Sequence, residues 1–77
     1  MIDQSKRELQ KYVKKVCTPK FEQYKMQRHQ CLKIEECVLY QINLITTFRD
    51  FKTVKQLNSE INFIASFYFS EYKRLLN

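Results

Sequence analysis

Glycine is absent from this chain of 77 residues, and Pro19 is its only proline. Glycine supplies the positive-φ positions of hairpin turns and tight loops, so a chain without it has few means of connecting the strands of a sheet. Helices need no such positions in their interiors. The sequence therefore predicts an all-α protein, a single small domain over residues 1–77, in which helices are joined by short polar breaks.

The first expected helix covers residues 3–17 and is amphipathic with a basic outer side. Ser5 and Glu8 have the spacing of an N-terminal capping box, and apolar residues recur behind them every three or four positions. Four basic side chains share the opposite face of this helix: Arg7, Lys11, Lys14 and Lys15.

A long second helix is expected over residues 19–49 and a third over residues 59–76. Thr18-Pro19 favours a helix start, because proline lacks the N–H that the first helical turn leaves unpaired. Asn58 or Ser59 is the expected N-cap of the third helix. These two helices are predicted to form an antiparallel hairpin, and the basic first helix completes a small bundle.

The main apolar stripe of the second helix is expected to include Val38, Ile42 and Phe48. Tyr40 and Leu44 lie outside this stripe, so the C-terminal part of the helix is apolar on more than one side. A helix of this kind is usually central, with neighbours on two flanks.

Phe63 and Phe67 are the candidate partner-contact residues of the third helix. Successive helical residues are about 100° apart, and this spacing directs both side chains away from the main apolar face. Two interpretations are open: an intermolecular contact, or burial under the long helix or under residues 50–58. The contact is favoured, because six Phe and five Tyr give more aromatic surface than a thin bundle of 77 residues is expected to bury.

The net charge of +6 is concentrated in the N-terminal part of the chain. Residues 1–33 contain nine Lys or Arg against three acids, whereas residues 34–77 contain five of each. Such asymmetry is typical of proteins that bind nucleic acid, an anionic lipid surface or an acidic protein, and also of faces that only keep a protein soluble.

The three cysteines are expected to be free thiols. Cys31 and Cys37 would lie about 9 Å apart along one helix axis, beyond the roughly 7 Å over which two Cα atoms can be bridged by a disulfide. Cys17 precedes the expected break, and Cys31 follows it by about three turns. Thiols so placed are expected to pack as small apolar groups.

Residues that could carry catalysis are sparse. His29 and Cys31 are two positions apart, so on a helix their side chains point in different directions, and they form neither a nucleophile pair nor a metal site. Glycine-rich phosphate-binding loops are excluded by composition. The chain is therefore predicted to be non-enzymatic, with no cofactor and no metal.

The leading interpretation is a non-catalytic accessory subunit of a larger assembly, with other protein subunits as partners. A mitochondrial membrane complex of the respiratory-chain type is the expected setting, because the basic first helix is similar to a mitochondrial address, although Asp3 and Glu8 are unusual in one. The location is otherwise expected to be intracellular. A small nucleic-acid-binding protein is the alternative, and a phage-type protein inhibitor is a second. No segment is expected to span a membrane.

Overall fold

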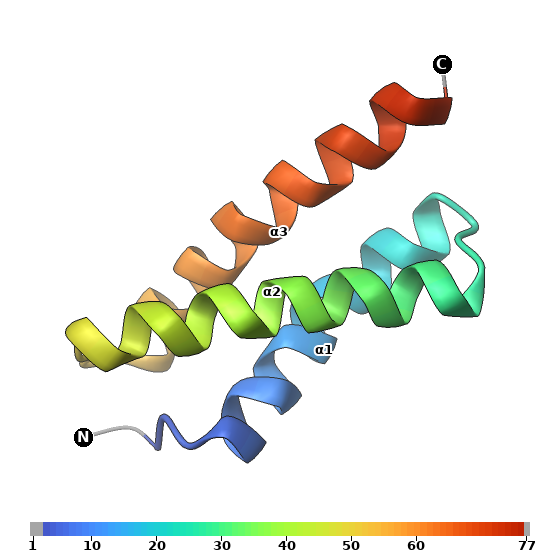
Figure 1. Ribbon diagram of the computed structural model, residues 1–77. Helices are drawn as coiled ribbons and strands as arrows, with labels where there is room; N and C mark the ends of the chain where they lie inside the picture. Colours follow the sequence, from blue (N-terminus) through green and yellow to red (C-terminus); the bar gives the residue numbers. More distant parts are fainter. Residues whose placement is uncertain (1–2, 77) are drawn as a thin grey trace.

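Three α-helices make up the computed structural model, which describes residues 3–76 (Figure 1). Helix α1 covers Lys6–Gln23, α2 covers Arg28–Phe48, and α3 covers Val54–Leu76. No strand occurs in residues 3–76, and each helix packs against the other two. In Figure 1, α2 crosses in front of α1, while α3 runs back alongside α2 and rises away from it. The predicted all-α fold with a small bundle is confirmed.

Helix α1 continues through Pro19, so the predicted break at Thr18-Pro19 is wrong. Pro19 lacks the N–H that would bond to the carbonyl four residues earlier. Beside it, Thr18 Oγ1 donates a hydrogen bond to the carbonyl of Lys14 at 2.6 Å. Pro19 itself lies on the exposed side of the helix, while Cys17 and Phe21 on either side are both buried. Burial of this inner face maintains the helix across the missing hydrogen bond.

The end of α1 lies at Gln23, where Lys25 follows in the left-handed conformation with φ 52°. The N–H of Met26 donates to the carbonyl of Phe21 at 3.1 Å, and the N–H of Lys25 donates to that of Glu22 at 3.2 Å. This pair of bonds is the Schellman motif, which usually has glycine at the left-handed position. A lysine occupies that position here, so the usual sequence signal for a helix end is missing.

Gln30 fixes the start of α2, which is later than the predicted residue 19. Its Oε1 accepts hydrogen bonds from the N–H of Gln27 at 3.1 Å and from the hydroxyl of Tyr72 at 3.2 Å. The first bond occupies one of the backbone donors that a helix N-terminus leaves unpaired. The second ties the beginning of α2 to the far end of α3.

Helix α3 begins at Val54, earlier than predicted, and Asn58 and Ser59 lie inside it rather than at its N-cap. The cap is Thr53, whose Oγ1 accepts a hydrogen bond from the N–H of Gln56 at 3.1 Å. Threonine is one of the preferred N-cap residues, because its hydroxyl pairs with a backbone donor of the first turn.

Phe51 anchors the short connection between α2 and α3. Its side chain is only 2% exposed, and its N–H donates to Gln4 Oε1 at 2.7 Å. Arg49 lies over the Phe51 ring, 4.8 Å from its centroid, and its guanidinium is 3.6 Å from the carboxylate of Glu60. The contacts to Gln4 and to Glu60 therefore hold the connection in place directly before α3 begins.

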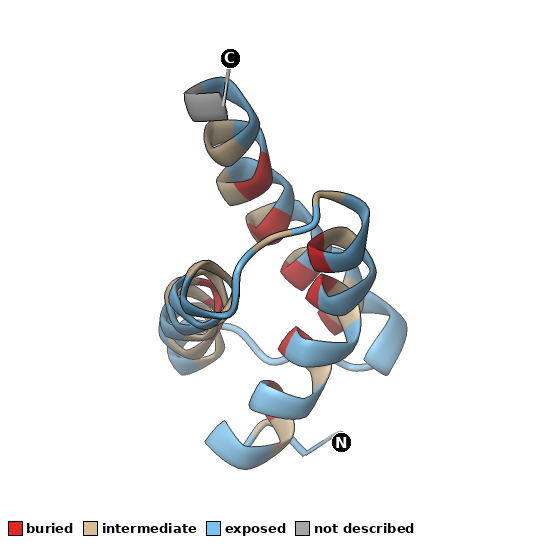
Figure 2. Cartoon of the chain, turned by 90° about the vertical axis from the view of Figure 1, so that its right-hand side faces the viewer, coloured by how far each residue is buried: buried red, intermediate tan, exposed pale blue. Residues whose placement is uncertain are grey.

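The core is one cluster of apolar side chains between the three helices. Figure 2 shows the buried segments on the sides of the helices that face one another. Helix α2 contributes only two fully buried side chains, and Phe48, which was expected on its buried stripe, is exposed. The core members are Leu9, Val13, Cys17, Phe21, Val38, Ile42, Phe51, Leu57, Ile61, Ala65 and Phe69.

Candidate functional site

Five of the large apolar side chains that are exposed on α2 and α3 form two rows, and together they are termed the apolar surface. Three form a row on α2 at four-residue spacing, and two form a row on α3. Each of the five side chains is roughly half exposed or more, so none of them belongs to the core. These residues are Tyr40 (66%), Leu44 (47%), Phe48 (84%), Phe63 (74%) and Phe67 (64%).

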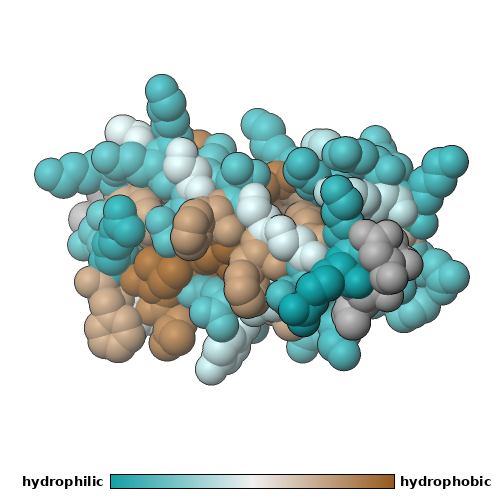
Figure 3. Space-filling view, turned by 90° about the horizontal axis from the view of Figure 1, so that it is seen from above, coloured by the Kyte–Doolittle hydropathy of each residue, from teal (hydrophilic) through white to brown (hydrophobic). Residues whose placement is uncertain are grey.

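The apolar residues on this side of the molecule are gathered together. Figure 3 shows them over the left-hand part of the face that it presents and out to its lower left edge, whereas the right-hand part is mostly hydrophilic. Single exposed apolar residues are ordinary on a protein surface. A contiguous group of them is less common, and it is typical of interaction sites and of aggregation-prone surfaces.

A groove between α2 and α3 adjoins the row on α3, and Gln41 is the residue of α2 in its lining. Tyr68, on the α3 side of the groove, is half-buried, and its ring meets that of Phe67 edge to face at a centroid distance of 5.7 Å. Tyr68 also borders the depression that Tyr40 lines, so it links the exposed residues of the two helices. The groove is lined by Gln41, Phe63, Ile64, Ser66, Phe67, Tyr68, Ser70 and Glu71.

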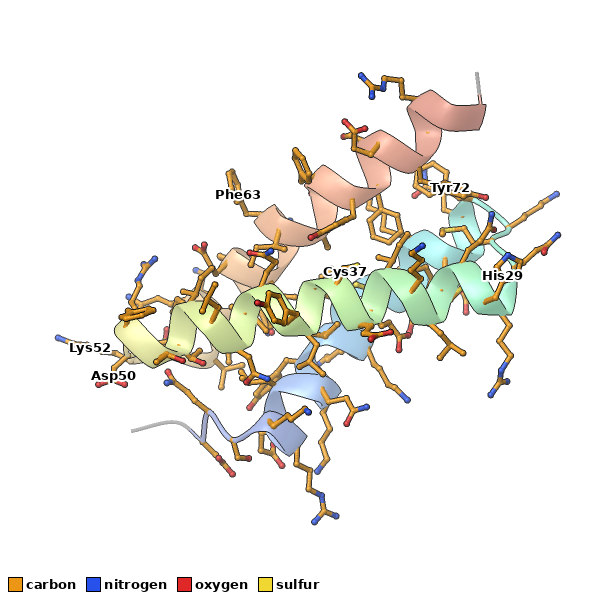
Figure 4. The ribbon with its side chains drawn as sticks, in the orientation of Figure 1. His29, Cys37, Asp50, Lys52, Phe63 and Tyr72 are labelled. Atoms are coloured by element: carbon orange, nitrogen blue, oxygen red, sulfur yellow. The ribbon has the colours of Figure 1, made fainter. Side chains whose placement is uncertain are left out.

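Phe63 and Phe67 lie off the core face of α3, as the helical spacing predicted. In Figure 4, Phe63 projects from α3 away from α2. Neither ring is covered by the long helix or by residues 50–58, so the interpretation that they are buried within the chain is wrong. Their part in an intermolecular contact stays a prediction.

The row on α2 was not predicted as a site. The sequence did place Tyr40 and Leu44 outside the main stripe, which was a usable signal, but Phe48 was assigned to the buried side. The periodicity of one helix does not reveal how far its neighbours extend around it. Here α1 and α3 cover the side of α2 that carries Val38 and Ile42, and they leave the Tyr40 side open.

The predicted basic face is divided by the structure into two parts. Arg7, Lys11 and Lys14 lie around one shallow depression on α1 and are termed the basic cluster. Within it, Lys11 Nζ donates to the carboxylate of Glu8 at 3.1 Å. Lys15 points elsewhere, toward α3.

A second groove, between α1 and α3, contains Lys15. Among the described residues, its lining holds two lysines, three uncharged polar residues and no acid. The Oδ1 atom of Asn58 in this lining is buried and has no hydrogen-bond partner among the described residues. The lining consists of Lys15, Val16, Val54, Lys55, Asn58, Ser59 and Asn62.

The chemistry available to the three free cysteines is limited. Cys17 is wholly enclosed, and this burial, with a smaller contribution from the Glu35 carboxylate, raises the pKa of its thiol to about 12. Such a thiol stays protonated at neutral pH and is a poor nucleophile. Burial also raises the pKa of Cys31. His29 lies exposed in the first turn of α2 (Figure 4).

Two further observations concern residues 3–76. No group of three or more His, Cys, Asp or Glu side chains in this part of the chain is arranged to hold a metal ion. None of the three helices combines the length and hydropathy needed to cross a bilayer.

Comparison of the chain with protein-family models, with curated proteins and with solved structures yields no match.

Proposed function

We propose that this protein is a non-catalytic structural subunit that joins a larger protein assembly through the apolar surface. The observation that carries the proposal is the exposure of two rows of large apolar side chains on adjacent helices, beside a groove. Removing one Phe or Leu side chain from water contributes about 1.5–3 kcal/mol. Four such side chains, together with Tyr40, therefore give a partner a large gain on binding.

The chain's own fold does not need these residues. The core cluster draws on all three helices and on Phe51 without any member of the apolar surface. Large aromatic residues that do not support the core are unfavourable in water and promote aggregation. Their presence is therefore accounted for by a partner that covers them.

The proposal is tested by capture of the full chain, carrying an affinity tag, from the cells that produce it. Phe63→Ser with Phe67→Ser is expected to abolish co-purification of the partner while leaving helical content unchanged, because both rings lie outside the core. The matched control is Leu32→Ser, which removes an apolar side chain that is 51% exposed but lies outside the apolar surface. Identical partners and yields with the double variant would reject this surface as the docking site.

A small nucleic-acid-binding protein remains the alternative, and the positive charge of α1 favours it. The basic cluster and the α1–α3 groove together present Arg7, Lys11, Lys14, Lys15 and Lys55. Phosphate contacts of this kind require clustered Lys and Arg, and they produce binding that weakens steeply with salt.

Two other expectations from the sequence stay predictions. The mitochondrial, respiratory-chain setting rests on the address-like character of the first helix, and organelle fractionation with an antibody to the chain tests it. A phage-type inhibitor would also dock through an apolar face, and it is distinguished by a captured partner that is an enzyme and loses activity in the complex.

A further inference from the structure

We infer that the apolar surface binds a second copy of this chain and so forms a two-fold symmetric dimer. The inference rests on the proposed function, because it names the partner that covers the same surface. Three features of the structure support it: the charge of the surface, its area and its shape.

The charge of the surface suits contact between identical molecules. A two-fold axis brings the same patch of both copies together, so any charged residue at its centre would face its own copy. None of the five residues of the apolar surface is charged. At its margins, Glu71 pairs with Arg74 at 3.0 Å and Arg49 with Glu60 at 3.6 Å, so these four charges are neutralised within each copy. Beside Tyr40, two lysines and one acid, Lys6, Lys33 and Glu36, leave a net charge of only +1.

The basic cluster does not oppose this arrangement. Arg7, Lys11 and Lys14 lie on α1, whereas the apolar surface is made by α2 and α3. Exposed charges further apart than the screening length of about 8 Å at physiological ionic strength repel only weakly. The +6 charge of each copy therefore lowers the affinity of the dimer without preventing it.

The area of the surface is close to what a stable dimer needs. An aromatic side chain offers about 150–250 Å², so the exposed fractions of the five residues leave roughly 600 Å² of apolar surface. A specific interface buries about 800 Å² on each partner, of which a polar rim forms part. Uncharged polar residues beside the surface, among them Gln41, Ser66 and Ser70, supply that rim.

The shape of the surface also suits a self-complementary contact. A two-fold interface requires that a ridge on each copy meets a hollow on the other. The row of Tyr40, Leu44 and Phe48 projects from α2 as a ridge, and Tyr68 joins the depression beside Tyr40 to the α2–α3 groove. In the dimer, the ridge of each copy packs into the groove of the other, and Phe63 and Phe67 at the groove close over it.

The dimer is tested with the purified full chain by sedimentation equilibrium over a range of concentrations. The expected mass is about 19 kDa, twice the 9.5 kDa of one chain. Phe67→Ser and Phe48→Ser, one on each helix, are each expected to raise the dissociation constant at least about tenfold. Leu32→Ser is expected to leave it unchanged. Far-UV circular dichroism checks that the helical content of each variant is retained.

Two results of the sedimentation experiment would overturn the dimer. A wild-type chain that keeps the 9.5 kDa mass of one copy at every concentration rejects it, and so does a dimer that Phe67→Ser and Phe48→Ser leave intact. Co-expression of two differently tagged copies separates this inference from the proposed function. Capture of the other copy supports the dimer, capture of a different protein alone rejects only the dimer, and capture of neither rejects both.

Discussion

Cys17 occupies the middle of the buried face of α1, where its thiol is enclosed by apolar side chains from the other helices. A thiolate at this position would lose its hydration without gaining a cationic partner, and the Glu35 carboxylate disfavours it further. The folded protein therefore holds the proton on Cys17 far more strongly than the unfolded chain does. Stability then depends on pH in the alkaline range.

The sign of this dependence follows from the raised pKa. The unfolded thiol titrates near 9.0 and the folded one near 12, so the contribution to stability is complete below pH 9 and is lost as the pH rises toward 12. Over that range the loss approaches about 1.4 kcal/mol per pH unit. Urea denaturation from pH 7 to 11 is expected to show a shallower alkaline decline for Cys17→Ala than for wild type. Equal declines would contradict the buried, protonated thiol.

Lys25 determines where α1 ends, because the Schellman motif requires a left-handed residue at that position. For a residue with a side chain, this conformation costs about 1–2 kcal/mol. Lys25→Gly is therefore expected to stabilise the protein by about 1 kcal/mol in urea denaturation. Lys25→Ala is the control, since it removes the same charge but keeps the Cβ atom. Equal stability of the two variants would show that Lys25 is not strained.

The helical content of this chain could be predicted from its sequence, but several helix boundaries could not. The absence of glycine predicted helices correctly, because it removes the usual means of building sheets. The same absence removed the usual sequence signal for the end of α1, where Lys25 adopts the left-handed conformation that glycine usually adopts. Pro19 then gave a false signal, because burial of Cys17 and Phe21 outweighs one missing hydrogen bond. Local residue preference is weaker than tertiary burial at these boundaries.

The candidate surface was likewise predicted only in part. Phe63 and Phe67 were identified because α3 has a single apolar face, from which both side chains clearly depart. The row of α2 was missed because that helix is apolar on more than one side, and its pattern does not say which side its neighbours cover. The packing of α1 and α3 against Val38 and Ile42 supplies that information.

At the scale of the whole molecule, the basic cluster and the apolar surface lie on different helices. The basic cluster lies on α1, and the apolar surface lies on α2 and α3. The two surfaces must therefore respond to salt in opposite ways. Contact between two copies buries uncharged side chains while two chains of net charge +6 approach, so screening of their repulsion strengthens it. Contact between the basic cluster and a polyanion is weakened by the same salt.

This difference gives a prediction for the chain in solution. Between about 50 and 500 mM NaCl, the dissociation constant of the dimer is expected to fall by a few fold, because the screening length shortens across that range. Any binding of a labelled oligonucleotide is expected to weaken steeply with salt. Lys14→Ala is expected to lower the salt dependence of this binding by the contribution of about one phosphate contact. Sedimentation equilibrium and fluorescence anisotropy measure the two constants on the same preparations. A dimer that dissociates as salt rises would mean that opposite charges hold the copies together, and the assignment of the interface to the uncharged face of α2 and α3 would then be wrong.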